Sequence, residues 1–121
     1  MEKEFEEELR RAWAERAAAA RQAREQRREA AWQKARAMAQ FLRKEYGVGQ
    51  TYLYGSLAWG PRFGERSDID LLVEGFPPAA GYWRMLVELE QIASPFEANV
   101  ALAEDARPEL REKAKRDGIS L

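Results

Sequence analysis

The segment Leu53–Gly75, LYGSLAWGPRFGERSDIDLLVEG, decides the fold prediction. The Gly55-Ser56 pair directly follows Thr51–Tyr54, a short aromatic and β-branched run that is typical of a strand. After a loop, Asp68–Glu74 reads DIDLLVE, which has the length and apolar content of a second strand. We therefore expect two strands connected by a glycine turn, a brief helical or turn segment, and a loop.

The two aspartates that open the second strand are its unusual feature. Residues i and i+2 of a strand point to the same face, so Asp68 and Asp70 lie together, while Ile69 and Leu71 face the opposite side. Two close carboxylates repel each other, and one stays protonated unless a cation removes the conflict. Because Mg²⁺ prefers oxygen ligands, the pattern predicts a site for one ion or two. A solvated strand edge is the alternative interpretation.

The Gly-Ser turn supplies groups that suit a phosphate. Gly55 lets the backbone turn sharply and approach a ligand closely. The amides of Ser56 and Leu57, with the Ser56 hydroxyl, can receive phosphate oxygens, more so if a short helix starts there. In the following loop, Arg62 and Arg66 are candidates for contacting a triphosphate. Simple strand termination is the alternative interpretation of the turn.

The N-terminal third is predicted to be helical. Residues 3–46 contain neither Pro nor Gly and are dominated by Ala, Glu, Arg and Gln. Residues 30–46 carry larger apolar side chains on one face, so we expect this part to cover the core and to end at Gly47. Residues 18–29 have almost nothing large to bury, so the helix is either continuous or broken there.

We divide the chain into a helical N-terminal extension, residues 1–29, and a domain of residues 30–121. In the extension, Phe5, Leu9 and Trp13 recur every four residues and form a narrow apolar stripe. Exposed apolar stripes often mark interaction sites, so this one docks either on the chain's own domain or on another subunit.

The C-terminal half contributes three more predicted elements. Residues 79–93 have helical spacing, residues 96–102 alternate apolar and polar like a strand, and residues 108–117 form a last helix with Pro at its start. The fold class is α/β of the α+β kind: a small mixed β-sheet with helices packed against it, plus the long N-terminal helix.

Composition excludes several kinds of chemistry. The chain of 121 residues has no cysteine and no histidine, so disulfides, Cys or His zinc sites and His general bases are excluded. Its net charge of −1 provides no overall attraction for nucleic acid. Neither a signal peptide nor a membrane-spanning segment is recognisable, and we expect a cytoplasmic protein.

The segment GSLAWGPRFGERSDIDLLV resembles the signature of the polymerase-beta-type nucleotidyltransferase superfamily, in which Asp-x-Asp follows a Gly-Ser pair within about a dozen residues. The small size and SDIDLLV are most similar to the minimal nucleotidyltransferase (MNT) group. The resemblance covers about residues 30–121, including the ending PELREKAKRDGISL. It implies the nucleotidyltransferase fold and Mg²⁺-dependent transfer of a nucleoside monophosphate, AMP from ATP, to a hydroxyl.

The resemblance also implies roles for particular residues. Asp68 and Asp70 match the catalytic metal carboxylates, and Gly55 and Ser56 match the phosphate-binding pair. The family's third carboxylate matches Asn99.

Because an amide stands at Asn99, Glu97 on the same predicted face becomes the candidate catalytic base. Some members are antitoxins that modify a tyrosine of a HEPN-domain toxin, so such a toxin is a candidate partner. The alternatives are an inactive partner-binding module and an RNA or antibiotic nucleotidyltransferase.

Overall fold

The computed structural model describes residues 1–60, 63–64 and 66–121, and it combines four helices and four strands. In chain order these are α1 (Glu2–Tyr46), β1 (Gln50–Tyr54), α2 (Ser56–Trp59), β2 (Ile69–Glu74), α3 (Tyr82–Ala93), β3 (Ala98–Leu102), α4 (Pro108–Asp117) and β4 (Ile119–Ser120). The predicted mixed α and β class with a long N-terminal helix is confirmed.

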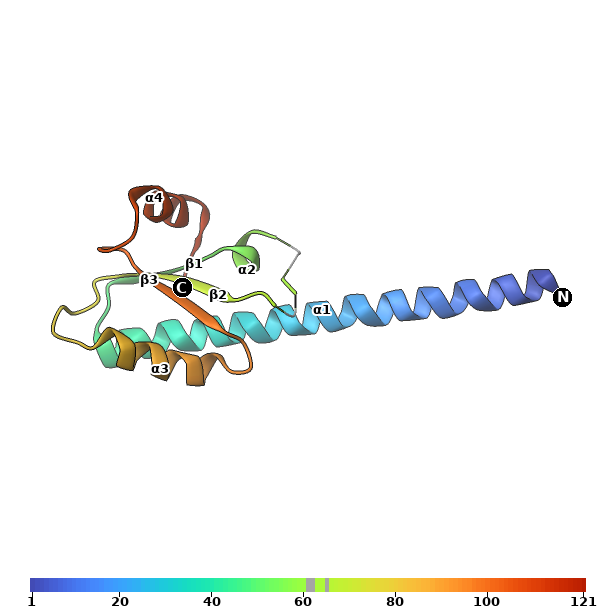
Figure 1. The fold of residues 1–121 in the computed structure, drawn as a ribbon, viewed down its shortest axis with the longest axis horizontal. Helices are drawn as coiled ribbons and strands as arrows, with labels where there is room; N and C mark the ends of the chain where they lie inside the picture. Colours follow the sequence, from blue (N-terminus) through green and yellow to red (C-terminus); the bar gives the residue numbers. More distant parts are fainter. Residues whose placement is uncertain (61–62, 65) are drawn as a thin grey trace.

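Helix α1 is one continuous element of 45 residues, so of the two alternatives for residues 18–29 the structure has the continuous helix. It ends at Gly47, whose φ of 63° is left-handed and whose N–H donates to the Arg43 carbonyl. Only the C-terminal part of α1 lies against the sheet, and the N-terminal part extends away from the rest of the molecule (Figure 1).

The sheet has the strand order β3-β2-β1-β4. Strand β2 pairs antiparallel with β1 and parallel with β3, and β4 adds antiparallel to β1. The parallel pair needs a crossover connection, which α3 provides between β2 and β3. The two-residue strand β4, which the sequence pattern did not predict, is too short for an alternation of apolar and polar residues to be recognised.

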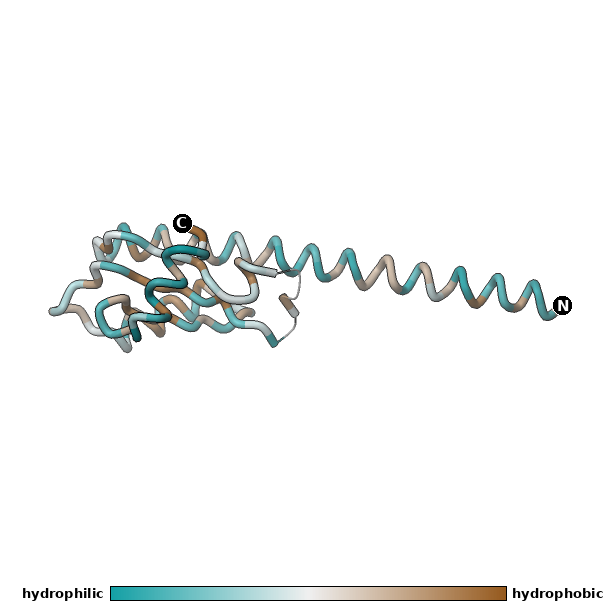
Figure 2. The backbone as a smooth tube through the Cα atoms, turned by 90° about the horizontal axis from the view of Figure 1, so that it is seen from above, coloured by the Kyte–Doolittle hydropathy of each residue, from teal (hydrophilic) through white to brown (hydrophobic). Residues whose placement is uncertain are grey.

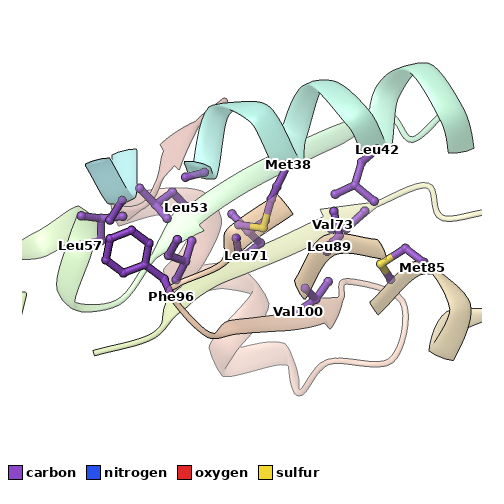
Figure 3. Close-up of a cluster of buried hydrophobic side chains, with 14 of the residues drawn as sticks. Met38, Leu42, Leu53, Leu57, Leu71, Val73, Met85, Leu89, Phe96 and Val100 are labelled. Carbon is purple, nitrogen blue, oxygen red and sulfur yellow. The ribbon is translucent and has the colours of Figure 1, made fainter. Parts of the chain in front are cut away.

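One face of the sheet is covered by α1 and α3, and the other by α4 (Figure 1). Figure 3 shows the first of these layers, where Met38 and Leu42 of α1 meet Leu71 of β2 and Leu89 of α3. All four side chains are fully buried. The core faces of α1 and β2 therefore lie where the hydrophobic periodicity predicts them.

A smaller cluster lies on the α4 face. It contains Tyr54, Leu72, Ala103 and Ala114. Since alternate residues of a strand face opposite sides, Ile69 and Leu71 point to the large cluster while Asp70 and Leu72 point to the α4 side. Within the described residues, no helix combines the length and apolar character needed to cross a membrane.

Candidate functional site

Gly55 brings the turn after β1 into direct contact with the Asp70 carboxylate. Its φ of 78° lies in the region that L-residues rarely adopt, and a Cβ added there would come within 2.2 Å of Asp70 Oδ2. Glycine is therefore required twice, once for the backbone conformation and once for space. The structure therefore places the Gly-Ser turn against Asp70, the second aspartate of the pair.

Asn99 lies beside Asp70 across the parallel pair of strands. The two residues are register partners, so their side chains leave the sheet on the same face. Asn99 Nδ2 donates a hydrogen bond to Asp70 Oδ1 at 3.3 Å. The position matched to the family's third carboxylate is thus adjacent to the second, and it holds an amide from which Asp70 accepts a hydrogen bond.

The charge of Asp68 acts on the half-buried carboxyl of Asp70. Burial raises the pKa of the Asp70 carboxyl, the hydrogen bond from Asn99 partly offsets this, and the charge of Asp68 raises the pKa again. Asp70 is half-buried. A cation between the two carboxylates would remove the cost of ionising Asp70, which is the condition under which such pairs usually bind metal.

Glu97 comes close to Asp68 rather than to Asp70. The Ile69 N–H donates to the Glu97 carbonyl at 2.9 Å, so the strand pairing continues toward Asp68. Asp68 and Glu97 line one open depression of about 360 Å³, together with Arg66. The structure therefore brings the predicted residues Asp68, Glu97 and Arg66 to one place, while Arg62 lies outside the described residues.

The amides of Ser56 and Leu57 come before the first hydrogen bonds of α2. That helix closes with N–H groups of Ala58 and Trp59, both donating to the Gly55 carbonyl. Of the two alternatives for this segment, a helix or a turn, the structure has a short helix that begins at Ser56. Its first amides are thus held beside the turn that contacts Asp70.

Two arginines of α1 reach the loop that leads into the site, and sequence reasoning did not find them. Arg27 Nε donates to the Gly64 carbonyl at 3.3 Å, and Arg28 donates to the Gly60 carbonyl. The Arg27 guanidinium also lies 5.0 Å from the Phe96 ring centroid and lines the depression of Asp68 and Glu97. The sequence could not indicate this role, because both arginines lie in a polar helical segment in which solvent-exposed arginines are common.

Trp59 has a structural partner. Its indole N–H donates to the Asp117 carbonyl at 2.7 Å, and Lys113 Nζ lies 4.8 Å from its ring centroid. These contacts connect α2 to α4, so Trp59 has a packing role between the two helices.

The candidate metal ligands of the site are oxygen atoms, which is the type of ligand that Mg²⁺ prefers. Asp68 and Asp70 supply carboxylates, and Mg²⁺ usually takes one or two of these together with water and substrate phosphates. Across residues 1–60, 63–64 and 66–121, no three His, Cys, Asp or Glu side chains form a group that would hold a metal ion. Asp68 and Asp70 therefore suit a Mg²⁺ ion that is also bound by a phosphate ligand better than they suit an ion bound by the protein alone.

No family model matches the chain, and no curated protein matches it at a significant level.

Proposed function

We propose that the chain has the nucleotidyltransferase fold and transfers a nucleoside monophosphate, AMP from ATP, to an acceptor hydroxyl with Mg²⁺. The observation that carries the proposal is the contact of the Gly55 turn with Asp70. A phosphate held by the Ser56 and Leu57 amides would lie next to the carboxylates of the Asp-x-Asp pair. Nucleotidyl transfer requires a phosphate-binding site and a metal-binding site that lie next to each other.

Each residue then has a defined task. Asp68 and Asp70 would hold Mg²⁺, which when bound neutralises charge on the phosphates and positions them. Ser56 and the adjacent amides would orient the triphosphate, and Arg66 would offset charge on the departing pyrophosphate. Glu97, which shares the depression with Asp68, would accept the proton of the attacking hydroxyl. Alignment and charge neutralisation supply most of the acceleration in this chemistry.

The proposed acceptor is a tyrosine hydroxyl of a HEPN-domain toxin, and the cytoplasm, where ATP is present, is the proposed compartment. This part of the proposal depends on the resemblance of residues 30–121 to the antitoxin group. The open depression beside Asp68 is consistent with an acceptor that enters as part of a folded partner.

Calorimetry with ATP and Mg²⁺ tests the site directly. Wild type is expected to bind Mg²⁺-ATP, and Asp68→Asn/Asp70→Asn is expected to lose binding. The matched control Asp105→Asn/Glu112→Gln also removes two carboxylates, both exposed and outside the site, and should bind like wild type. Equal binding by the Asp68/Asp70 variant would refute the metal assignment. Transfer is measured with labelled ATP and the co-purified partner.

Asn99 favours a second candidate, a catalytically weakened or inactive partner-binding module. An amide donating to Asp70 occupies the place of the third carboxylate. If this amide limits catalysis, Asn99→Asp should raise transfer by about tenfold or more, because a positioned base is worth about 10²–10⁴-fold. Nucleotide binding without transfer in both proteins would favour the module.

A further inference from the structure

The extension of α1 carries large apolar side chains that nothing in the described part of the molecule covers. Phe5, Leu9 and Trp13 are 66%, 44% and 64% exposed. The helix carrying them projects away from the sheet, and Figure 2 shows it as mainly hydrophilic with isolated apolar positions. The alternative in which the stripe docks on the chain's own domain is therefore wrong.

The stripe continues the core-facing side of α1. Eighteen residues make five turns of an α-helix, so Trp13 lies on the same face as Ala31, and Phe5 on the same face as Ala23. Ala31 is fully buried in the core. The face that covers the sheet in the second half of α1 is thus the face that stays open in the first half.

The two ends of this exposed half have opposite charge. Residues 2–8 contain five glutamates and one lysine, whereas residues 20–28 contain four arginines and one glutamate. Glu6 and Arg24 flank the apolar stripe on the same side, because their separation of 18 residues makes five helical turns. The charges are complementary when the acidic end of one helix lies beside the basic end of another.

An open depression lies where the basic end meets the domain. It has a volume of about 490 Å³ and is lined by Ala20, Ala23, Arg24, Arg27 and Gly64. Its small alanine side chains leave room for a large apolar residue, and Arg24, one of its two arginines, suits an acidic neighbour.

We propose that residues 2–28 of α1 pair antiparallel with the same residues of a second copy of this chain. The pairing is centred near Ala14 and Glu15. In such a two-fold arrangement, residues at the same angular position of the two helices lie on the same side of the interface. Phe5 of one copy then meets Ala23 of the other, and Glu6 meets Arg24.

The size of the pairing suits a specific dimer. Each aromatic side chain buries about 150–250 Å² when fully covered, and the dimer contains Phe5 and Trp13 twice. With Leu9 and the alanines, the total approaches the ~1,200 Å² at the lower end of specific interfaces. A parallel pair would place the glutamate-rich tips side by side, and their repulsion disfavours it.

The experiment is the molar mass of the full chain by sedimentation equilibrium and light scattering over a range of concentrations. Wild type is expected to be a dimer. Leu9→Glu/Trp13→Glu should be a monomer with unchanged sheet and α3 signals in NMR spectra. Val87→Glu is the matched control, because Val87 is 55% exposed on α3, and it should leave the dimer intact.

Charge reversal tests the orientation. Glu6→Arg and Arg24→Glu should each weaken the dimer by about tenfold at low salt, because each places like charges opposite one another. The combined variant Glu6→Arg/Arg24→Glu restores opposite charges in an antiparallel pair and should recover wild-type association.

Cross-linking gives an independent measure of orientation, since the chain has no cysteine of its own. A mixture of Glu6→Cys and Arg24→Cys proteins should form a mixed disulfide, while Glu6→Cys alone should not. A monomer at high micromolar concentration overturns the proposal, as does cross-linking of Glu6→Cys with itself. Dimers that persist in the Leu9/Trp13 variant, or a stripe covered by a different protein or by nucleic acid in the purified complex, overturn it as well.

Discussion

At the scale of single residues, Gly55 is subject to two constraints that act in different ways. Its φ of 78° restricts the backbone, and the 2.2 Å distance that a Cβ at this position would have to Asp70 Oδ2 restricts the space. Gly47 is also left-handed, at φ 63°, yet nothing lies within 4 Å of a Cβ placed there. An alanine at Gly47 therefore strains only the backbone, whereas an alanine at Gly55 strains the backbone and also displaces the Asp70 carboxylate.

Gly55→Ala is expected to lower the free energy of unfolding by about 1–3 kcal/mol and to weaken Mg²⁺-ATP binding, since a methyl displaces Asp70. Gly47→Ala should cost about 1–2 kcal/mol through the backbone alone and leave binding unchanged. Urea unfolding and calorimetry measure both quantities. Unaltered nucleotide affinity in Gly55→Ala would separate the turn from the site.

Asp70→Asn tests the electrostatic state of the site. Because burial raises the folded-state pKa of Asp70 above its unfolded value, the stability it contributes is present below the unfolded pKa and is lost as pH rises through the folded pKa. The asparagine of the variant cannot ionise. The free energy of unfolding of the variant minus that of wild type should therefore increase as pH rises from about 3 to 7. Urea unfolding in chelator at several pH values measures this difference. A constant difference across the range would contradict it.

At the scale of elements, α1 has a second role besides covering the sheet. Its Arg27 and Arg28 donate hydrogen bonds to the carbonyls of Gly64 and Gly60, which are two described positions of the loop that precedes Asp68. Ser67 adds a local connection, accepting a hydrogen bond from the Gly64 N–H at 3.0 Å. The loop is thus anchored to a helix that is distant in sequence.

Arg28→Ala is expected to lower the free energy of unfolding by about 1–2 kcal/mol, since a carbonyl loses a charged donor. Hydrogen exchange should rise in peptides that contain Gly60 and Asp68. Arg11→Ala, on the exposed part of the same helix, should change neither quantity. Similar exchange in both variants would show that the loop does not depend on α1.

Element prediction succeeded where a local pattern was strong. The apolar spacing of residues 30–46 and the alternation around Ile69 and Leu71 follow from which faces are buried, so they can be recognised without the fold. Strand β4 and the role of Arg27 could not be recognised in this way. Each depends on a partner about 37 residues or more away, as Arg27 to Gly64 and Ile119 to Leu53 illustrate.

At the scale of the whole molecule, mass is distributed unevenly, with a compact α and β domain at one end of a long helix (Figure 1). The domain includes contacts made by Arg27 and Arg28, although the sequence placed both in the extension. We therefore expect Arg27 and Arg28 to contribute to the stability of the domain, and the helical residues before them to contribute less.

Two truncations measure this difference. Deleting residues 1–19 keeps Arg27 and Arg28, whereas deleting residues 1–29 removes them. The longer deletion should have a free energy of unfolding lower by about 2 kcal/mol, because two partly buried carbonyls lose their charged donors. Both truncations lack Phe5, Leu9 and Trp13, so self-association does not bias the comparison. Equal stability would place the boundary of the folded unit after residue 29.

The sequence by itself determined the three longer helices, the first three strands, the core faces and the turn at Gly55, because these depend on neighbours along the chain. Tertiary structure alone decided that Asn99 would donate to Asp70, that Glu97 would accompany Asp68, and that α1 would anchor the loop. Strand register and helix packing set those distances, and both result from burying the whole core at once.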